Sequence, residues 1–425
     1  MTRAANSRTT YAVWEITLKC NLACNHCGSR AGDARVDELT TAECLDLVRQ
    51  LKQVGIDEVT LIGGEAYLRR DWLEIARAIV DEGMICGITT GGLSLKPEMA
   101  RQIKAAGINS VSVSIDGLKE THDYLRGVPG SWDAAFRALK ALTDAGVQAS
   151  CNTQINRRSM PELRELYGLI KAAGIKGWQY QLTVPMGNAA DNAEVLLQPY
   201  ELLELFPLLA ELVEQGMADG IVMGSGNNIG YYGPYDQLLM TRGGASSNIY
   251  YAGCEAGTST LGIEADGKIK GCPSLPSTPY TGANIRDMSL AEIMAYTEPL
   301  QINKQPRYTE ESTAHMWGFC GTCEFKQFCR GGCHWTAHVF YGKRGNNPYC
   351  HHRALEFDRQ GLRERVIRTE AAPGTPFDHG VFASVVERRD APLPAVTWLD
   401  RGDHALDFEV RDGGDPYVAP SAVGS

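Results

Sequence analysis

Three cysteines near the amino terminus have the spacing of an iron–sulfur ligand set. Cys20, Cys24 and Cys27 form a C-x3-C-x2-C run that follows an apolar stretch. Three thiolates cannot complete a tetrahedral cage, but they can bind three irons of a 4Fe–4S cube and leave the fourth iron open. An open coordination position distinguishes a catalytic metal site from a closed structural one. The run therefore predicts an open cluster, with a zinc knuckle or unrelated buried cysteines as the alternatives.

The composition narrows the class of protein. A chain of 425 residues with 44% apolar and 22% charged residues predicts a globular protein of two domains plus a tail. No segment approaches the length of a membrane span and no secretory signal is present, so we expect a cytoplasmic protein without a membrane partner. Thirteen cysteines in a reducing compartment favour metal ligation. The net charge of −10, without a basic stripe, argues against a nucleic-acid partner.

The elements that must position these cysteines alternate between strands and helices. The strands are expected at Tyr11–Lys19, Glu58–Ile62, Ile85–Thr90, Ser110–Asp116, Gln148–Asn156 and Trp178–Val184. The helices are expected at Ala42–Gly55, Asp71–Gly83, Pro97–Ala106, Trp132–Ala145, Glu162–Ala173 and Glu201–Gly216. Strand–helix units with short, glycine-punctuated links predict an α/β fold with a parallel sheet and helices outside.

Polar residues recur on one face of three successive strands. They are Ser110, Ser112, Ser114 and Asp116, then Ser150, Asn152, Gln154 and Asn156, then Gln179, Gln181 and Thr183. A sheet covered by helices on both faces would instead be continuously apolar. The pattern favours a curved, partly open barrel whose lumen holds a polar ligand, over a sheet face exposed to solvent.

With its three cysteines in the first strand–helix loop, the chain resembles the radical S-adenosylmethionine (SAM) enzymes. The resemblance implies a partial (β/α)6 barrel in which SAM chelates the open iron and one electron cleaves SAM to a 5′-deoxyadenosyl radical. Gly63, Gly64 and Glu65 resemble the family's GGE motif, which meets the methionine ammonium. His26 matches a position near adenine.

Five further residues resemble family positions that face SAM, with generic packing in the lumen as the alternative. They are Ser114, Asp116, Arg126, Asn152 and Gln154. The Thr90–Gly91 turn is assigned no specific role. The sequence identifies no catalytic acid or base.

The cysteine-rich region further along resembles the SPASM domain, which carries two auxiliary iron–sulfur clusters. The resemblance assigns the first auxiliary cluster to Cys254, Cys272 and Cys333. It assigns the second to Cys320, Cys323, Cys329 and Cys350. The first is one thiolate short, so its fourth position is open, or is bound by a group such as Glu255 or by substrate. In total the chain is expected to bind three 4Fe–4S clusters and SAM.

The other three cysteines, Cys44, Cys86 and Cys151, are expected to be buried packing residues. The expected organisation is a radical SAM barrel at 10–220, a bridge at 221–250, a SPASM domain at 251–358 and a peripheral tail at 370–425.

The resemblance implies an oxidoreductase that matures a ribosomally made peptide by abstracting hydrogen, leading to oxidation or cross-linking. Expected partners are a precursor peptide, an electron donor such as flavodoxin or ferredoxin, and a separate leader-binding protein. The alternatives are tailoring of a small molecule, such as a haem or porphyrin side chain, alcohol or amine oxidation, and a non-enzymatic iron–sulfur scaffold.

Overall fold

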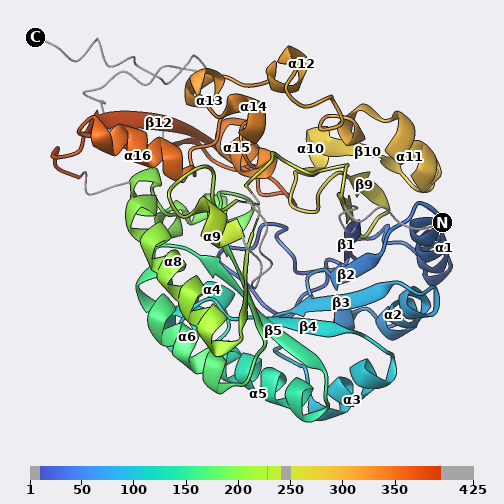
Figure 1. Cartoon of the computed structure of the whole chain (residues 1–425). Coiled ribbons are helices and arrows are strands. Elements are labelled where there is room, and N and C mark those ends of the chain that lie inside the picture. The colour runs from blue at the N-terminus through green and yellow to red at the C-terminus, as the bar shows by residue number, and fades with distance from the viewer. Residues whose placement is uncertain (1–9, 227, 241–249, 394–425) are drawn as a thin grey trace, which may run out of the picture.

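A ten-stranded curved sheet forms the centre of the computed structural model, which describes residues 10–226, 228–240 and 250–393 (Figure 1). Its strands are β1 (Tyr11–Glu15), β2 (Glu58–Ile62), β3 (Ile85–Thr90), β4 (Ser110–Ser114), β5 (Gln148–Ile155), β6 (Gly177–Leu182), β7 (Val222–Ser225), β8 (Thr260–Ile263), β9 (Lys268–Lys270) and β10 (Thr281–Asn284). Their order is β10-β9-β8-β1-β2-β3-β4-β5-β6-β7. The strands from β8 through β1 to β7 are parallel, so the predicted parallel α/β barrel is confirmed.

Helices cover the outer face of the barrel strands (Figure 1). They are α1 (Thr41–Gln53), α2 (Trp72–Asp81), α3 (Pro97–Ala105), α4 (Lys119–Arg126), α5 (Ser131–Asp144), α6 (Leu163–Ala172) and α8 (Leu202–Asp219). The side chain of Thr40 accepts a hydrogen bond from the Glu43 N–H in a capping box, which fixes the start of α1. Cys44 on α1, Cys86 on β3 and Cys151 on β5 are all buried in the apolar core.

The two faces of the sheet differ in polarity and exposure. On β5, Ala149, Cys151, Thr153 and Ile155 are buried against the helices, whereas Ser150, Asn152 and Gln154 are partly accessible. On β6, Gln179 is exposed and Gln181 is partly accessible, while the intervening aromatic and aliphatic side chains are buried. The polar face therefore lines the inside of the curved sheet, as the alternation predicts.

The cysteine-rich region continues the barrel sheet through the pairing of β8 with β1. Short helices follow, namely α10 (Ser277–Tyr280), α11 (Leu290–Tyr296), α12 (Glu310–Thr313), α13 (Gly318–Thr322), α14 (Lys326–Cys329), α15 (His334–Tyr341) and α16 (His351–Arg359). Between the two regions lie β7 and α9 (Asp236–Met240). The rest of the expected bridge, residues 241–249, lies outside the described residues.

A carboxy-terminal hairpin replaces the first part of the expected peripheral tail. β11 (Leu362–Glu370) and β12 (Val381–Arg388) pair in antiparallel fashion and pack on α15 and α16. Residues 394–425 lie outside the described residues.

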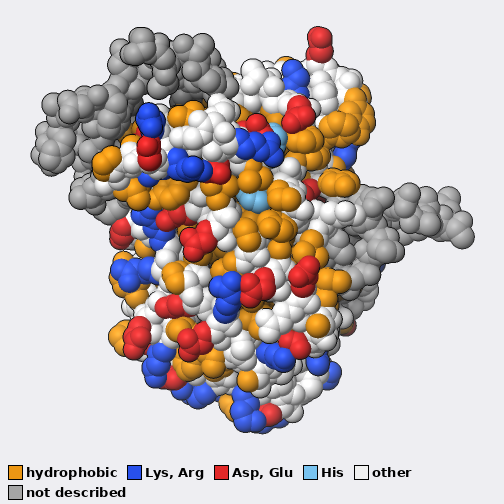
Figure 2. Space-filling view, turned by 60° about the vertical axis from the view of Figure 1, so that its left-hand side comes forward, with side chains coloured by type: hydrophobic (Ala, Val, Ile, Leu, Met, Phe, Trp, Pro, Cys, Tyr) orange, Lys and Arg blue, Asp and Glu red, His pale blue; other side chains and the backbone are white. Residues whose placement is uncertain are grey.

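Helices in the described part of the chain are all too short or too polar to cross a membrane. Figure 2 shows acidic and basic side chains interspersed over one face.

Candidate functional site

Cys20, Cys24 and Cys27 lie together in the loop that follows β1, called here the cluster loop (residues 16–32). All three are partly accessible. The Leu22 N–H donates to Cys20 Sγ at 3.4 Å and the Ala31 N–H donates to Cys27 Sγ at 3.4 Å. Burial raises the pKa of the Cys20 thiol to about 11 and that of Cys24 to about 12, and the neighbouring thiols add to both shifts. Bound metal cations would offset the cost of ionising three adjacent thiols.

Gly63 and Gly64 allow the end of β2 to touch the cluster loop. A Cβ atom on Gly63 would lie 2.4 Å from the Thr17 carbonyl oxygen, and one on Gly64 would lie 2.4 Å from the Lys19 carbonyl oxygen. The backbone N–H groups of Gly64 and Glu65 donate to those two carbonyls, each at 2.8 Å. Any larger side chain would separate the two segments, so the GG pair positions both the loop and Glu65.

The Glu65 carboxylate is 2% exposed and is oriented by the turn after β3. Thr90 Oγ1 donates to one of its oxygens and the Gly91 N–H to the other, both at 2.5 Å. Burial raises the pKa of this carboxyl. A cation would offset the cost of ionising it there, so the site suits an ammonium group. The Thr90–Gly91 turn, for which the sequence predicts no specific role, orients this group.

His26, Asp116 and Arg126 form a buried cluster beneath the cluster loop. Asp116 is fully buried, with His26 Nε2 at 3.0 Å and Arg126 Nη2 at 2.6 Å from its Oδ2. Although burial opposes ionisation, the charges of Arg126 and His26 hold the pKa of Asp116 well below its usual range. Arg126 Nη1 also donates to Cys24 Sγ at 3.9 Å. Asp116 therefore joins His26 of the loop to Arg126, which also contacts Cys24, and a direct contact with SAM remains a prediction.

The inner face of the sheet contributes acceptors that the described residues leave free. Asn152 Oδ1 and Thr183 Oγ1 are buried without a hydrogen-bond partner in the described part of the chain. Ser114 is largely buried, and Gln154 is partly accessible on the same face as Asn152. Burying a polar atom without a hydrogen-bond partner costs free energy, so these positions fit a polar ligand in the lumen.

The segment that begins α7 (Asn188–Asp191) supports the cluster loop from below, and the sequence analysis did not identify it. Gly187 has φ +58°, and a Cβ atom there would lie 2.3 Å from the Cys27 carbonyl oxygen. The Asn188 N–H donates to that carbonyl at 2.9 Å, and Asn188 Nδ2 donates to the Cys24 carbonyl at 2.8 Å. Asn192 Nδ2 donates to the Asn25 carbonyl at 2.9 Å. The Gly-Asn pair is the one local signal that could have indicated such a turn.

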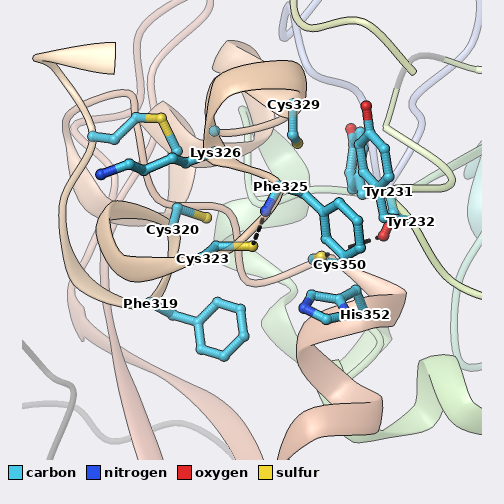
Figure 3. A pocket seen from close by; sticks show the side chains of 12 residues that line it. Tyr231, Tyr232, Phe319, Cys320, Cys323, Phe325, Lys326, Cys329, Cys350 and His352 are labelled. Atoms are coloured by element: carbon cyan, nitrogen blue, oxygen red, sulfur yellow. Dashed lines mark hydrogen bonds between the residues drawn. The ribbon is translucent and has the colours of Figure 1, made fainter. Parts of the chain in front are cut away.

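Four cysteines in the region around α13 and α14 line one cavity (Figure 3). They are Cys320, Cys323, Cys329 and Cys350. Phe319, Phe325 and His352 line the same cavity. The described residues hold no set of His, Cys, Asp and Glu side chains that is close enough to share one metal ion. A cavity with four thiols on its wall fits a cluster with one thiolate for each iron.

The other three cysteines of this region also lie close together. Cys254 and Cys272 pack against one apolar cluster with Tyr280. Burial raises the pKa of Cys333 to about 12, and the charges of Cys254 and Cys272 add to the shift. The Glu255 carboxylate accepts a hydrogen bond from the Ser259 hydroxyl. The structure thus gathers the predicted thiols and gives Glu255 a partner within the protein.

A buried arginine lies between the two cysteine groups. Arg330 follows Cys329, is 5% exposed, and donates to the backbone carbonyls of Asn303 and Ala252 at 3.4 and 3.3 Å. Its Nε has no hydrogen-bond partner in the described part of the chain. Burial lowers the pKa of Arg330, and the charges of Cys254 and Cys329 oppose that shift. A buried cation is stable only near compensating negative charge, which thiolate-bound iron–sulfur clusters carry. The cysteine thiols of this region and the buried positive charge of Arg330 therefore both fit iron–sulfur clusters.

Comparison with known proteins agrees with this geometry. Residues 14–156 match the Radical SAM superfamily. An AdoMet-dependent heme synthase of Methanosarcina barkeri is 31% identical over 349 residues, which cover 80% of this chain and 95% of that protein. The mycofactocin maturase MftC of Mycolicibacterium smegmatis is 28% identical, over 79% of this chain and 81% of that protein. The crystal structure of Streptococcus suis SuiB bound to S-adenosylmethionine has a TM-score of 0.61 at 18% identity, over 81% of this chain and 76% of that chain.

The chain belongs to the radical SAM superfamily of enzymes, in which a 4Fe–4S cluster and SAM are the working cofactors. Within that superfamily, its architecture is that of the radical SAM/SPASM enzymes.

Proposed function

We propose that this enzyme is a radical SAM/SPASM maturase that abstracts a hydrogen atom from a ribosomally made peptide, leading to oxidation or cross-linking. The cluster and SAM, when bound, supply an electron and a 5′-deoxyadenosyl radical, which becomes 5′-deoxyadenosine by taking a hydrogen atom from a substrate C–H bond. The protein has to hold these groups, orient them and exclude water.

The residues of the cluster loop and its supports have distinct parts in this proposal. Cys20, Cys24 and Cys27 hold the cluster. The Glu65 carboxylate, aimed by Thr90 and Gly91, accepts hydrogen bonds from the methionine ammonium. His26, Asp116 and Arg126 form the buried base of the loop, and Arg126 adds positive charge beside Cys24.

The inner face of β5 and β6 is the observation that supports a peptide substrate. The accessible side chains there are Ser150, Asn152, Gln154, Gln179 and Gln181, which are all neutral and can both donate and accept hydrogen bonds. A peptide backbone presents neutral N–H and C=O groups, which this surface complements. A tetrapyrrole would need a broad apolar slot. The name of the relative MftC and the solved complex of SuiB with its precursor peptide SuiA agree with this choice.

The auxiliary clusters complete the proposal. Cys320, Cys323, Cys329 and Cys350 would hold one auxiliary cluster in the cavity of Figure 3. The other would be held by Cys254, Cys272 and Cys333, with a fourth position open for exchange. Both would accept or relay an electron released during substrate oxidation. An external donor such as flavodoxin or ferredoxin, and a separate leader-binding protein, are the partners we propose.

A second candidate is the tailoring of a tetrapyrrole side chain. It is favoured by the 31% identity to an AdoMet-dependent heme synthase and by similarity to an Fe-coproporphyrin III synthase of the same organism. The polar inner face of the sheet is the observation against it.

One experiment separates the two candidates. The anaerobically reconstituted, reduced enzyme is incubated with SAM and either iron coproporphyrin III or a candidate precursor peptide. Mass spectrometry then follows substrate mass and 5′-deoxyadenosine. We expect a loss of hydrogen mass in the peptide, with matching 5′-deoxyadenosine. A mass change in the porphyrin alone would overturn the peptide assignment and establish the second candidate.

A further inference from the structure

We propose that Asp378, in the turn of the carboxy-terminal hairpin, is a positioning residue that fixes the cluster loop through Arg30. The turn comprises residues 371–380, between β11 and β12. The inference does not depend on the substrate, because it concerns only the loop that carries Cys20, Cys24 and Cys27.

Asp378 is buried and hydrogen-bonded within its own turn. Its side chain is 4% exposed, and its Oδ2 accepts hydrogen bonds from the N–H groups of Gly374 and Thr375, the latter at 2.8 Å. Its Oδ1 accepts from Arg30 Nε at 2.8 Å. Both carboxylate oxygens therefore have fixed partners, and the direction in which Asp378 meets Arg30 is set by the backbone.

Arg30 connects Asp378 to the backbone of the cysteines through Asn188. Its Nη1 donates to Asn188 Oδ1 at 2.8 Å. The same Asn188 donates to the carbonyls of Cys24 and Cys27 through its side chain and its backbone. One guanidinium and one amide thus connect the hairpin turn to the backbone of two predicted iron ligands.

Arg30 has a second carboxylate partner, which provides a comparison. Asp191 Oδ2 lies 2.6 Å from Arg30 Nη1, but the Asp191 side chain is 46% exposed. Water and salt screen an exposed pair, whereas removing one partner from a buried pair leaves an uncompensated charge. The pair with Asp378 should therefore constrain Arg30 more strongly.

The hairpin is itself anchored to both regions of the molecule. Gln198 exchanges two hydrogen bonds with the backbone of Val366 on β11, at 2.7 and 3.1 Å. Arg353 on α16 forms a buried ion pair with Glu364 on β11 at 2.6 Å, and the Arg353 N–H donates to Cys350 Sγ at 3.5 Å. The backbone of the turn also contacts the segment that begins α7, because the Gly187 N–H donates to the Asp378 carbonyl at 2.8 Å.

The connection from Asp378 through Arg30 to the cluster loop matters because the geometry of a radical-forming site tolerates little displacement. Misplacing reacting groups by about 1 Å can lower a rate by about 100-fold. The cluster loop has no regular secondary structure in its cysteine run and is partly accessible, so its position depends on neighbouring segments.

The test uses the full-length, reconstituted enzyme with Asp378→Asn as the main variant. Asp390→Asn is the matched control, since Asp390 lies just after the same hairpin and pairs with Arg388 while both side chains are about 71–72% exposed. The readout is the change that SAM produces in the electron paramagnetic resonance spectrum of the reduced enzyme, together with iron content, SAM affinity and melting temperature. The SAM-dependent difference isolates the cluster of the cluster loop from any auxiliary cluster.

We expect Asp378→Asn to keep its iron while showing an altered SAM-dependent spectrum and a rate of 5′-deoxyadenosine formation lowered about tenfold or more. Asp378→Glu should restore part of the signal, and Asp390→Asn should match the wild type. A wild-type SAM-dependent spectrum in Asp378→Asn would overturn the proposal. An equal loss of all cluster signals with a lower melting temperature would also overturn it, because that result indicates a purely structural role.

A second variant covers the case in which Asp378→Asn does not fold. Arg30→Lys retains the positive charge but removes the fork that contacts Asp378 and Asn188 together. We expect the same altered spectrum in this variant, and an unaltered one would contradict the proposal.

Discussion

The cluster loop and the cysteine-rich region hold thiols in opposite ways. The loop places Cys20, Cys24 and Cys27 within a few residues of one another, and all three are partly accessible. The second region gathers cysteines from Cys254 to Cys350, and its members include thiols that are less than 10% exposed. In the proposed assignment, the local set leaves one iron position open for SAM and depends on neighbouring segments for its position, whereas the distributed cysteines are held by the fold around them.

The largest expected effect is that of removing a thiol from the cluster loop. Cys24→Ala should abolish 5′-deoxyadenosine formation, since three thiols are the minimum that holds this cluster. Iron should fall by about four atoms per chain, and the auxiliary signals should persist. Iron analysis and chromatography of the products check this. Retained SAM cleavage would show that the loop does not hold the working cluster.

Removing a thiol from the cavity of Figure 3 should have a different outcome. Cys350→Ala should lose a similar amount of iron, because this group is proposed to supply one thiolate for each iron. It should also weaken the start of α16, where Cys350 Sγ accepts from the Arg353 N–H. Reduction of SAM without substrate should persist while substrate conversion is lost, as measured by product formation. Loss of SAM cleavage equal to that in Cys24→Ala would remove the distinction between the two regions.

Substitutions at Glu65 test the proposed binding of SAM at the open iron of the cluster loop. Glu65→Gln preserves shape but removes the charge that faces the ammonium, so the dissociation constant of SAM should rise roughly 10- to 100-fold. Thr90→Val, which removes one of the donors to Glu65, should have a smaller effect of about 3- to 10-fold. Calorimetric titration with SAM measures both. Unchanged affinity in Glu65→Gln would exclude the proposed contact.

The smallest effect is expected at the junction between the two regions. Glu15 on β1 pairs with Arg35 at 3.3 Å and accepts from the Ala265 N–H, while Arg35 also pairs with Glu264 and Asp266. Burial raises the pKa of Glu15 from 4.5 to about 8, against the opposing charge of Arg35. The folded protein therefore binds this proton more tightly than the unfolded chain, and the resulting stability is present below pH 4.5 and lost as the pH rises through about 8.

Glu15→Gln cannot ionise, so its melting temperature should fall less than that of the wild type as the pH rises from 4.5 to about 8. The difference should be a few °C, because a given change in unfolding free energy shifts the melting temperature of a large domain only slightly. Scanning calorimetry measures it, with the exposed Glu82→Gln as the control. Parallel pH profiles for Glu15→Gln and the wild type would show that Glu15 does not titrate in this range.

The barrel could be predicted from sequence because its signals are local. The strands Glu58–Ile62 and Ile85–Thr90 have the expected bounds, since apolar runs ending at glycine mark them clearly. The polar face of β5 was likewise visible as an alternation of residue types. Both signals arise within a few residues of one another.

The hairpin and the supports of the cluster loop could not be predicted because their reasons are long-range. On β11, Arg363 and Arg365 are buried against Glu387 of β12. Because these buried residues are charged, the strand lacks the alternation of apolar and polar residues that would indicate it in the sequence. The part played by Thr90 depends on Glu65, twenty-five residues earlier. The periodicity and composition of a sequence do not reveal contacts between residues that lie far apart in the chain.

The measurement that tests the central claim most directly is the yield of 5′-deoxyadenosine from SAM. The enzyme is reconstituted anaerobically to about twelve irons per chain, the content of three 4Fe–4S clusters, and reduced. We predict that the wild type forms 5′-deoxyadenosine and methionine together, only with reductant. A fully iron-loaded, reduced wild-type enzyme that forms no 5′-deoxyadenosine would contradict the account.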